Sequence, residues 1–120
     1  MSRTLVIKLT AGAEAPERAN QAFTVAATAV ASGAEVSLWL TGDAVWFAVP
    51  GRADDFSLPH AAPLSELLAA VLAGGRLTVC TQCAKRRSLE QSDLVSSARI
   101  AGAPAFAEEI LADGVQAIVY

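Results

Sequence analysis

Two spacings of apolar residues alternate along the chain, and together they predict strands and helices in turn. Short apolar runs predict strands, whereas apolar residues three and four positions apart predict helices between them. The expected strands cover residues 4–10, 35–40, 76–80, 98–101 and 115–119. The expected helices cover residues 16–31, 64–72, 81–87 and 104–111, with shorter helical pieces after Thr41 and over residues 89–94.

Strands that alternate with helices predict a mostly parallel sheet covered on both faces. We therefore expect an α/β fold: a three-layer α/β/α sandwich, flavodoxin-like, with a five-stranded sheet and a single domain over residues 1–120. The first strand is expected near the middle of the sheet with the third strand beside it. Residues 50–63, rich in proline and without periodicity, are expected to form an irregular loop.

Composition and charge narrow the function classes. Hydrophobic residues make up 53% of the 120-residue chain and charged residues only 18%, which is the reverse of the disordered signature. The net charge of −3 argues against a nucleic-acid partner, which needs a clustered basic face. Every apolar stretch is interrupted before the length of a membrane span, and residues 1–8 read as a strand. We expect a cytoplasmic protein without a membrane span.

Cys80 is the strongest candidate for chemistry. It ends a predicted strand and begins a predicted helix, and ligand sites of open α/β sheets form at such strand ends. Free N–H groups and the dipole of a helix N-terminus lower the pKa of a thiol there. An anion at this helix start would meet Thr81, Gln82, Lys85, Arg86 and Arg87. The alternative is a cysteine that only packs as a small apolar residue.

Cys83 follows three residues later, and a Cys-x-x-Cys pair has three chemical interpretations. The first is a redox pair in which one thiol attacks and the other resolves. The second is half of a zinc site, whose remaining ligands would have to come from another subunit because His60 is the sole histidine. The third is a persulfide-carrying Cys80 with the second thiol assisting or merely present.

Other polar and aromatic residues carry less weight. His60 lies in the irregular loop and is expected to be solvated, with a role as proton donor near the thiol as the alternative. Trp39 is expected in the core or at a subunit interface. Glu108 and Glu109 are expected on a solvated face or as helix-end charges. Neither a phosphate-binding loop nor a dinucleotide fingerprint is present in the sequence, so we expect no cofactor. We also expect no metal.

Residues 77–88 resemble the apolar strand, cysteine and basic helix start of the DsrE/DsrF-like family, which includes sulfur-relay subunits. The similarity extends over residues 23–45 and 100–119. It implies a DsrEFH-like α/β/α subunit that assembles into trimers or hexamers, with Cys80 at the position that carries persulfide sulfur in relay members. Cys83 matches only some branches of the family, and Ser88 stands where many members have glycine.

Three hypotheses follow. In the leading one, the chain is a cytoplasmic sulfur-relay protein of the sulfurtransferase type, in which the Cys80 thiolate accepts sulfane sulfur from a sulfur donor and passes it to a partner protein or small thiol. In the second, Cys80 and Cys83 cycle between dithiol and disulfide. In the third, the chain is a non-catalytic oligomeric binding module whose cysteines only pack.

Overall fold

The computed structural model describes residues 3–120. Its strands are β1 (Thr4–Leu9), β2 (Glu35–Leu40), β3 (Arg76–Cys80), β4 (Arg99–Ala101) and β5 (Val115–Val119). Its α-helices are α1 (Pro16–Ala31), α2 (Leu64–Gly74), α3 (Thr81–Arg86) and α4 (Ala103–Leu111), and its 3₁₀ helices are η1 (Gly42–Ala48), η2 (Ala53–Asp55) and η3 (Gln91–Asp93). The predicted elements are confirmed, except that the piece expected over 89–94 shortens to η3.

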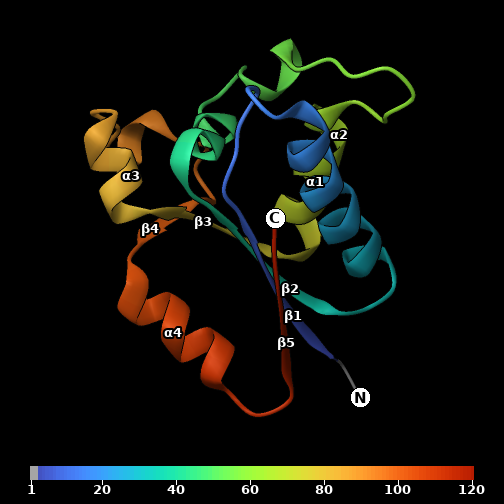
Figure 1. Ribbon diagram of the computed structural model, residues 1–120, viewed down its shortest axis with the longest axis vertical. Helices are drawn as coiled ribbons and strands as arrows, with labels where there is room; N and C mark the ends of the chain where they lie inside the picture. Colours follow the sequence, from blue (N-terminus) through green and yellow to red (C-terminus); the bar gives the residue numbers. More distant parts are fainter. Residues whose placement is uncertain (1–2) are drawn as a thin grey trace.

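The strands form one sheet in the order β4-β3-β2-β1-β5, and its four strand pairs are parallel (Figure 1). The predicted α/β class and parallel sheet are confirmed. The expected position of the third strand is wrong, because β3 lies beside β2 and β2 occupies the centre. Four consecutive strands lie side by side, as consecutive elements usually do, and only then does the chain cross to the other edge with β5. Flavodoxin has a different order, 2-1-3-4-5.

One face of the sheet carries the hydrophobic core beneath α1 and α2. Alternate strand residues point into it, including Ile7, Leu38 and Leu77, all fully buried. The two helices approach closely because glycine stands where they meet: a Cβ on Gly74 would lie 2.4 Å from Cγ1 of Val30. Within the described residues no helix has the length and apolar character to cross a membrane.

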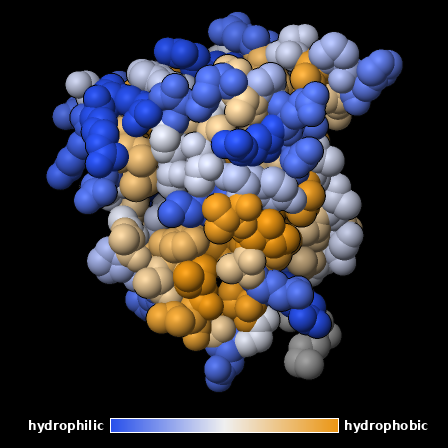
Figure 2. All heavy atoms as spheres, viewed as in Figure 1, coloured by the Kyte–Doolittle hydropathy of each residue, from blue (hydrophilic) through white to orange (hydrophobic). Residues whose placement is uncertain are grey.

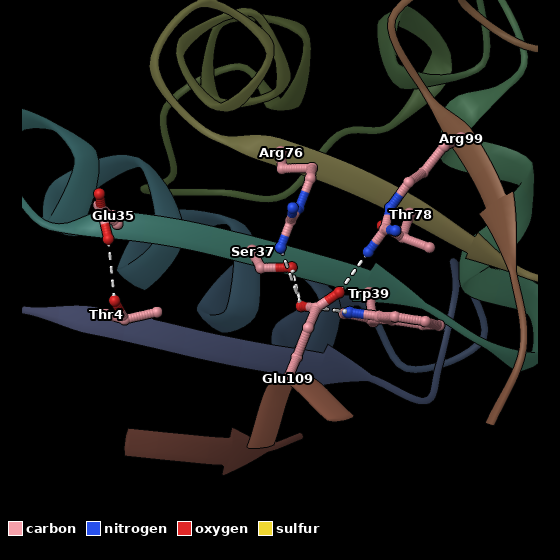
Figure 3. A network of polar contacts seen from close by, with 8 residues as sticks. All are labelled: Thr4, Glu35, Ser37, Trp39, Arg76, Thr78, Arg99 and Glu109. Atoms are coloured by element: carbon pink, nitrogen blue, oxygen red, sulfur yellow. Dashed lines mark hydrogen bonds and ion pairs between the residues drawn. The ribbon is translucent and has the colours of Figure 1, made fainter. Parts of the chain in front are cut away.

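The opposite face carries the buried polar side chains Ser37 and Thr78, and α4 lies across it. Glu109 of α4 reaches down to the strands and accepts hydrogen bonds from Ser37 Oγ at 2.6 Å and Trp39 Nε1 at 3.1 Å (Figure 3). Its carboxylate also pairs with Arg99, and with Arg76 at 3.4 Å. The expectation that Glu109 is solvated is therefore wrong. Since no residue of α4 is fully buried, this carboxylate is the main polar anchor of the helix.

Arg99 continues the Glu109 network into the sheet. Its Nε donates to Oγ1 of Thr78 at 2.7 Å, so this fully buried hydroxyl is satisfied. Its guanidinium carbon also lies 5.5 Å from the ring centroid of Trp39. The network thus fixes both α4 and the indole beneath it.

We predict that Glu109→Gln lowers the free energy of unfolding at pH 7 by about 1.5–3 kcal/mol, the usual range for hydrogen bonds to a charged group. Burial alone would raise the pKa of Glu109, but hydrogen bonds from Ser37 and Trp39 and the charges of Arg76 and Arg99 lower it overall. A lowered folded-state pKa stabilises the fold above the unfolded value of about 4.3, and this stabilisation is lost as the pH falls through the folded value.

Urea unfolding from pH 7 downward measures this effect. The difference between parent and variant should shrink as the pH falls below about 4. Glu108→Gln is the matched control, because Glu108 is exposed on the same helix, and it should behave like the parent. Equal stability of the parent and Glu109→Gln at pH 7 would contradict the prediction.

Candidate functional site

Cys80 lies at the junction between β3 and α3, at the carboxyl edge of the sheet. It is the last residue of β3 and the N-cap of α3, with extended backbone angles of φ −62° and ψ 128°. In a parallel sheet the carboxyl ends of the strands meet at this edge, which places Cys80 near the ends of β1 and β2. The thiol is half-buried.

The surroundings of Cys80 favour its thiolate. Burial alone would raise the pKa of the Cys80 thiol, but the Cys83 N–H, the Cys83 thiol and the Gln82 N–H act against it, and the charge of Lys8 adds to them. The pKa is lowered overall. The helix N-terminus therefore acts on the thiol as expected, whereas the cation that contributes comes from β1 and not from the basic run after Cys83.

Cys83 occupies a different environment one helical turn further on. Its side chain is buried, with 8% exposed. The N–H of Gly42 points at its Sγ at 3.2 Å, and Nη1 of Arg86 lies 4.0 Å from the same sulfur. Gly42 can approach because it has φ +56° and a Cβ there would lie 2.9 Å from the carbonyl oxygen of Thr10.

A cleft of about 510 Å³ opens beside Cys80. Four of the residues singled out from the sequence line it, namely Cys80, Thr81, Gln82 and Lys85. A volume of this size is within the range that holds small molecules. The cleft therefore gives Cys80 a route to a reaction partner.

Arg86 and Arg87 do not line this cleft. Arg87 Nε and Nη2 donate to Asp43 Oδ1 at 3.0 and 2.7 Å, and Nη1 donates to the carbonyl oxygen of Cys83 at 3.0 Å. These contacts tie α3 to η1, so Arg87 has a positioning role here. Of the two thiols, Arg86 contacts only that of Cys83, which is buried. His60 lines a separate hollow with Glu17.

The far wall of the cleft was not predicted from the sequence. It consists of Lys8 of β1, Trp39 of β2 and Phe106 of α4. The indole and phenyl rings meet edge to face with centroids 5.2 Å apart, and Nζ of Lys8 lies 5.0 Å from the Phe106 centroid. Lys8 and Trp39 are direct neighbours in the β1–β2 register. The available signal was Lys8 itself, a charge inside an apolar strand.

Among residues 3–120, no three histidine, cysteine, aspartate or glutamate side chains are grouped so that they could hold a metal ion. A zinc ion at Cys80 and Cys83 would need ligands from another chain. What the site does offer is a nucleophilic sulfur, a nearby cation and an aromatic wall.

Comparison with known proteins agrees with the fold. The profile of the DsrE/DsrF-like family matches residues 4–120. The structure is similar to the ychN protein from E. coli, with a TM-score of 0.75 and 18% identity over 98% of this chain and 99% of that one. It is also similar to MTH1491 from Methanobacterium thermoautotrophicum, a protein of unknown function, with a TM-score of 0.74 and 10% identity over 99% and 100% of the two chains. No curated protein sequence matches the chain.

We predict that alkylation of Cys80 by iodoacetamide reaches its plateau rate at a lower pH than that of an unperturbed cysteine, because the thiolate is stabilised. Lys8→Met should raise the apparent pKa, since it removes the nearby positive charge. Lys85→Met is the matched control and should have the smaller effect, because Lys8 is the cation whose charge lowers the Cys80 pKa. Rates are measured by mass spectrometry of the Cys80 peptide, and an ordinary pKa in the parent would refute the assignment.

Proposed function

The chain belongs to the DsrE/DsrF-like family, a family associated with sulfur relay, and on this premise we propose that Cys80 is the thiolate that accepts sulfane sulfur. The observation that carries the proposal is the position of Cys80. The thiol lies in a cleft at a helix N-terminus, where main-chain N–H groups and Lys8 favour its ionised form. A thiolate is the form of cysteine that attacks sulfur.

Sulfur transfer at this site needs no cofactor. The Cys80 thiolate attacks the outer sulfur of a donor persulfide, a new Sγ–S bond forms, and the donor's S–S bond breaks with the donor leaving as a thiolate. The negative charge leaves with the donor thiolate, and the product is a Cys80 persulfide that ionises at its terminal sulfur by losing the proton it received with that sulfur. Attack by an acceptor thiolate on that terminal sulfur passes it on and restores the Cys80 thiolate.

The cleft suits a partner that presents a thiol or persulfide. Its polar side holds Thr81, Gln82 and Lys85, and its opposite wall is aromatic. A donor or acceptor protein would insert a cysteine here, and a small thiol would fit as well. We place this chemistry in the cytoplasm, where thiols remain reduced.

An apolar surface also supports assembly with further copies of this chain. Leu111 of α4 and Ala117, Ile118 and Val119 of β5 are exposed, and we call these residues the α4–β5 patch. Figure 2 shows apolar surface gathered on one face of the molecule. Leu111 is 80% exposed and Val119 64%. β5 is an edge strand without a charged residue, and such an edge invites pairing with another strand. A second copy is the partner we assign, in a trimer or hexamer.

Sulfur loading tests the role of Cys80. After exposure to a small persulfide donor and rapid quenching, we expect Cys83→Ser to gain the mass of one sulfur atom, removable by reductant. Cys80→Ser should gain none, because it lacks the attacking thiolate, although both variants keep the fold by circular dichroism. Intact-mass spectrometry reads the result. Equal loading of Cys80→Ser would show that another residue carries the sulfur.

Assembly is tested at the α4–β5 patch. We expect Val119→Lys to shift the chain from oligomer to monomer, since a buried interface excludes an unpaired charge. Ala31→Lys, at an exposed position at the end of α1, is the control and should leave the oligomer intact. Sedimentation velocity gives the masses, and a monomeric parent protein would contradict this assignment.

A further inference from the structure

The two thiols of the site differ in access. Cys80 is half-buried and lines the cleft, whereas Cys83 is buried and does not line it. A sulfur donor that enters the cleft therefore meets Cys80. Cys83 therefore reacts with a group that is already inside the protein.

Cys83 is placed to react with Cys80. Cys80 is the N-cap of α3 and Cys83 is the third residue of this helix, so one helical turn separates the two thiols. The Cys-x-x-Cys spacing is that of dithiols that oxidise to a disulfide. The Cys83 thiol also acts on the Cys80 sulfur as a hydrogen-bond donor, which is one of the causes of the lowered Cys80 pKa.

Two donors converge on Cys83. The Gly42 N–H at 3.2 Å and the Arg86 guanidinium at 4.0 Å both point at Sγ. Both contacts fix the position of the Cys83 sulfur beside the start of α3. A cysteine that serves only as a small apolar residue would have no use for this arrangement.

We propose that Cys83 discharges an undelivered persulfide from Cys80 as sulfide. This step rests on the proposed function, because it starts from the Cys80 persulfide. The Cys83 sulfur attacks Sγ of Cys80, a Cys80–Cys83 disulfide forms, and the bond to the terminal sulfur breaks. The proton of Cys83 moves to the departing sulfur, which leaves as HS⁻. The sulfane sulfur is reduced and the two cysteines are oxidised, so no other reactant is required.

Discharge competes with delivery. While an acceptor thiol occupies the cleft, it attacks the terminal sulfur; when none arrives, Cys83 attacks Sγ instead. The resulting disulfide blocks further loading until a cellular dithiol reduces it. The chain would thus hold sulfur for a limited time, and the disulfide between its two cysteines would mark that the sulfur has been lost.

The test uses a glutathione persulfide whose terminal sulfur is ³⁴S. The reduced full chain is mixed with it, freed of excess reagent and of thiols, and followed by intact mass and by ³⁴S-sulfide in solution. We expect the parent to release one labelled sulfide for each disulfide formed, seen as a loss of two hydrogens. Cys83→Ser, and Cys83→Ala as a second variant, should keep the added sulfur and release no labelled sulfide.

The outcomes separate this inference from the proposed function. A parent that keeps the added sulfur as long as Cys83→Ser does would overturn the discharge step and leave Cys80 as the carrier. Absence of loading in both Cys83 variants, together with absence of labelled sulfide from the parent, would overturn both. Arg86→Met gives an independent check: we expect slower discharge with unchanged loading, and an unchanged discharge rate would count against the assigned role of the guanidinium.

Discussion

The contact between the Glu109 carboxylate and the open face of the sheet holds the candidate site together. Helix α4 has no fully buried side chain, so burial of apolar surface alone attaches the helix only weakly to the strands. Hydrogen bonds from Ser37 and Trp39 and the ion pair with Arg99 set its position instead. Because α4 supplies Phe106 to the cleft, the shape of the space in front of Cys80 depends on a carboxylate on the same helix.

The reactivity we assign to Cys80 comes from main-chain geometry more than from side-chain charge. The turn from β3 into α3 aims the N–H groups of Gln82 and Cys83 at the sulfur, and Lys8 adds a positive charge from a neighbouring strand. The basic residues after Cys83 mostly make other contacts: Arg87 ties α3 to η1, and Arg86 faces the Cys83 sulfur. The two cysteines thus have separate surroundings: Cys80 faces the cleft, and Cys83 faces the interior.

The local sequence pattern was enough to predict the helices, the strands and the position of Cys80, because periodicity, prolines and glycines act within a few residues. It did not predict the strand order, which depends on how α2 packs beside α1, or the aromatic wall, which joins residues from three separate elements. Glu109 looked like a solvated charge because two of its hydrogen-bond donors, Ser37 and Trp39, are 72 and 70 positions away in the chain. Ser88 shows the reverse case: its φ of +56° is a conformation that favours glycine, the residue that the resemblance to the family implies for this position.

Helix α4 has one side in the cleft and ends at Leu111, within the exposed α4–β5 patch. A neighbouring subunit that covers the patch would therefore also restrain the wall in front of Cys80. By mass action, any state that binds the neighbour more tightly is enriched as the protein concentration rises. Protein abundance would thereby become a variable of the site: a chain diluted away from its copies would keep its nucleophile, but its aromatic wall would lose the restraint that the neighbour supplies.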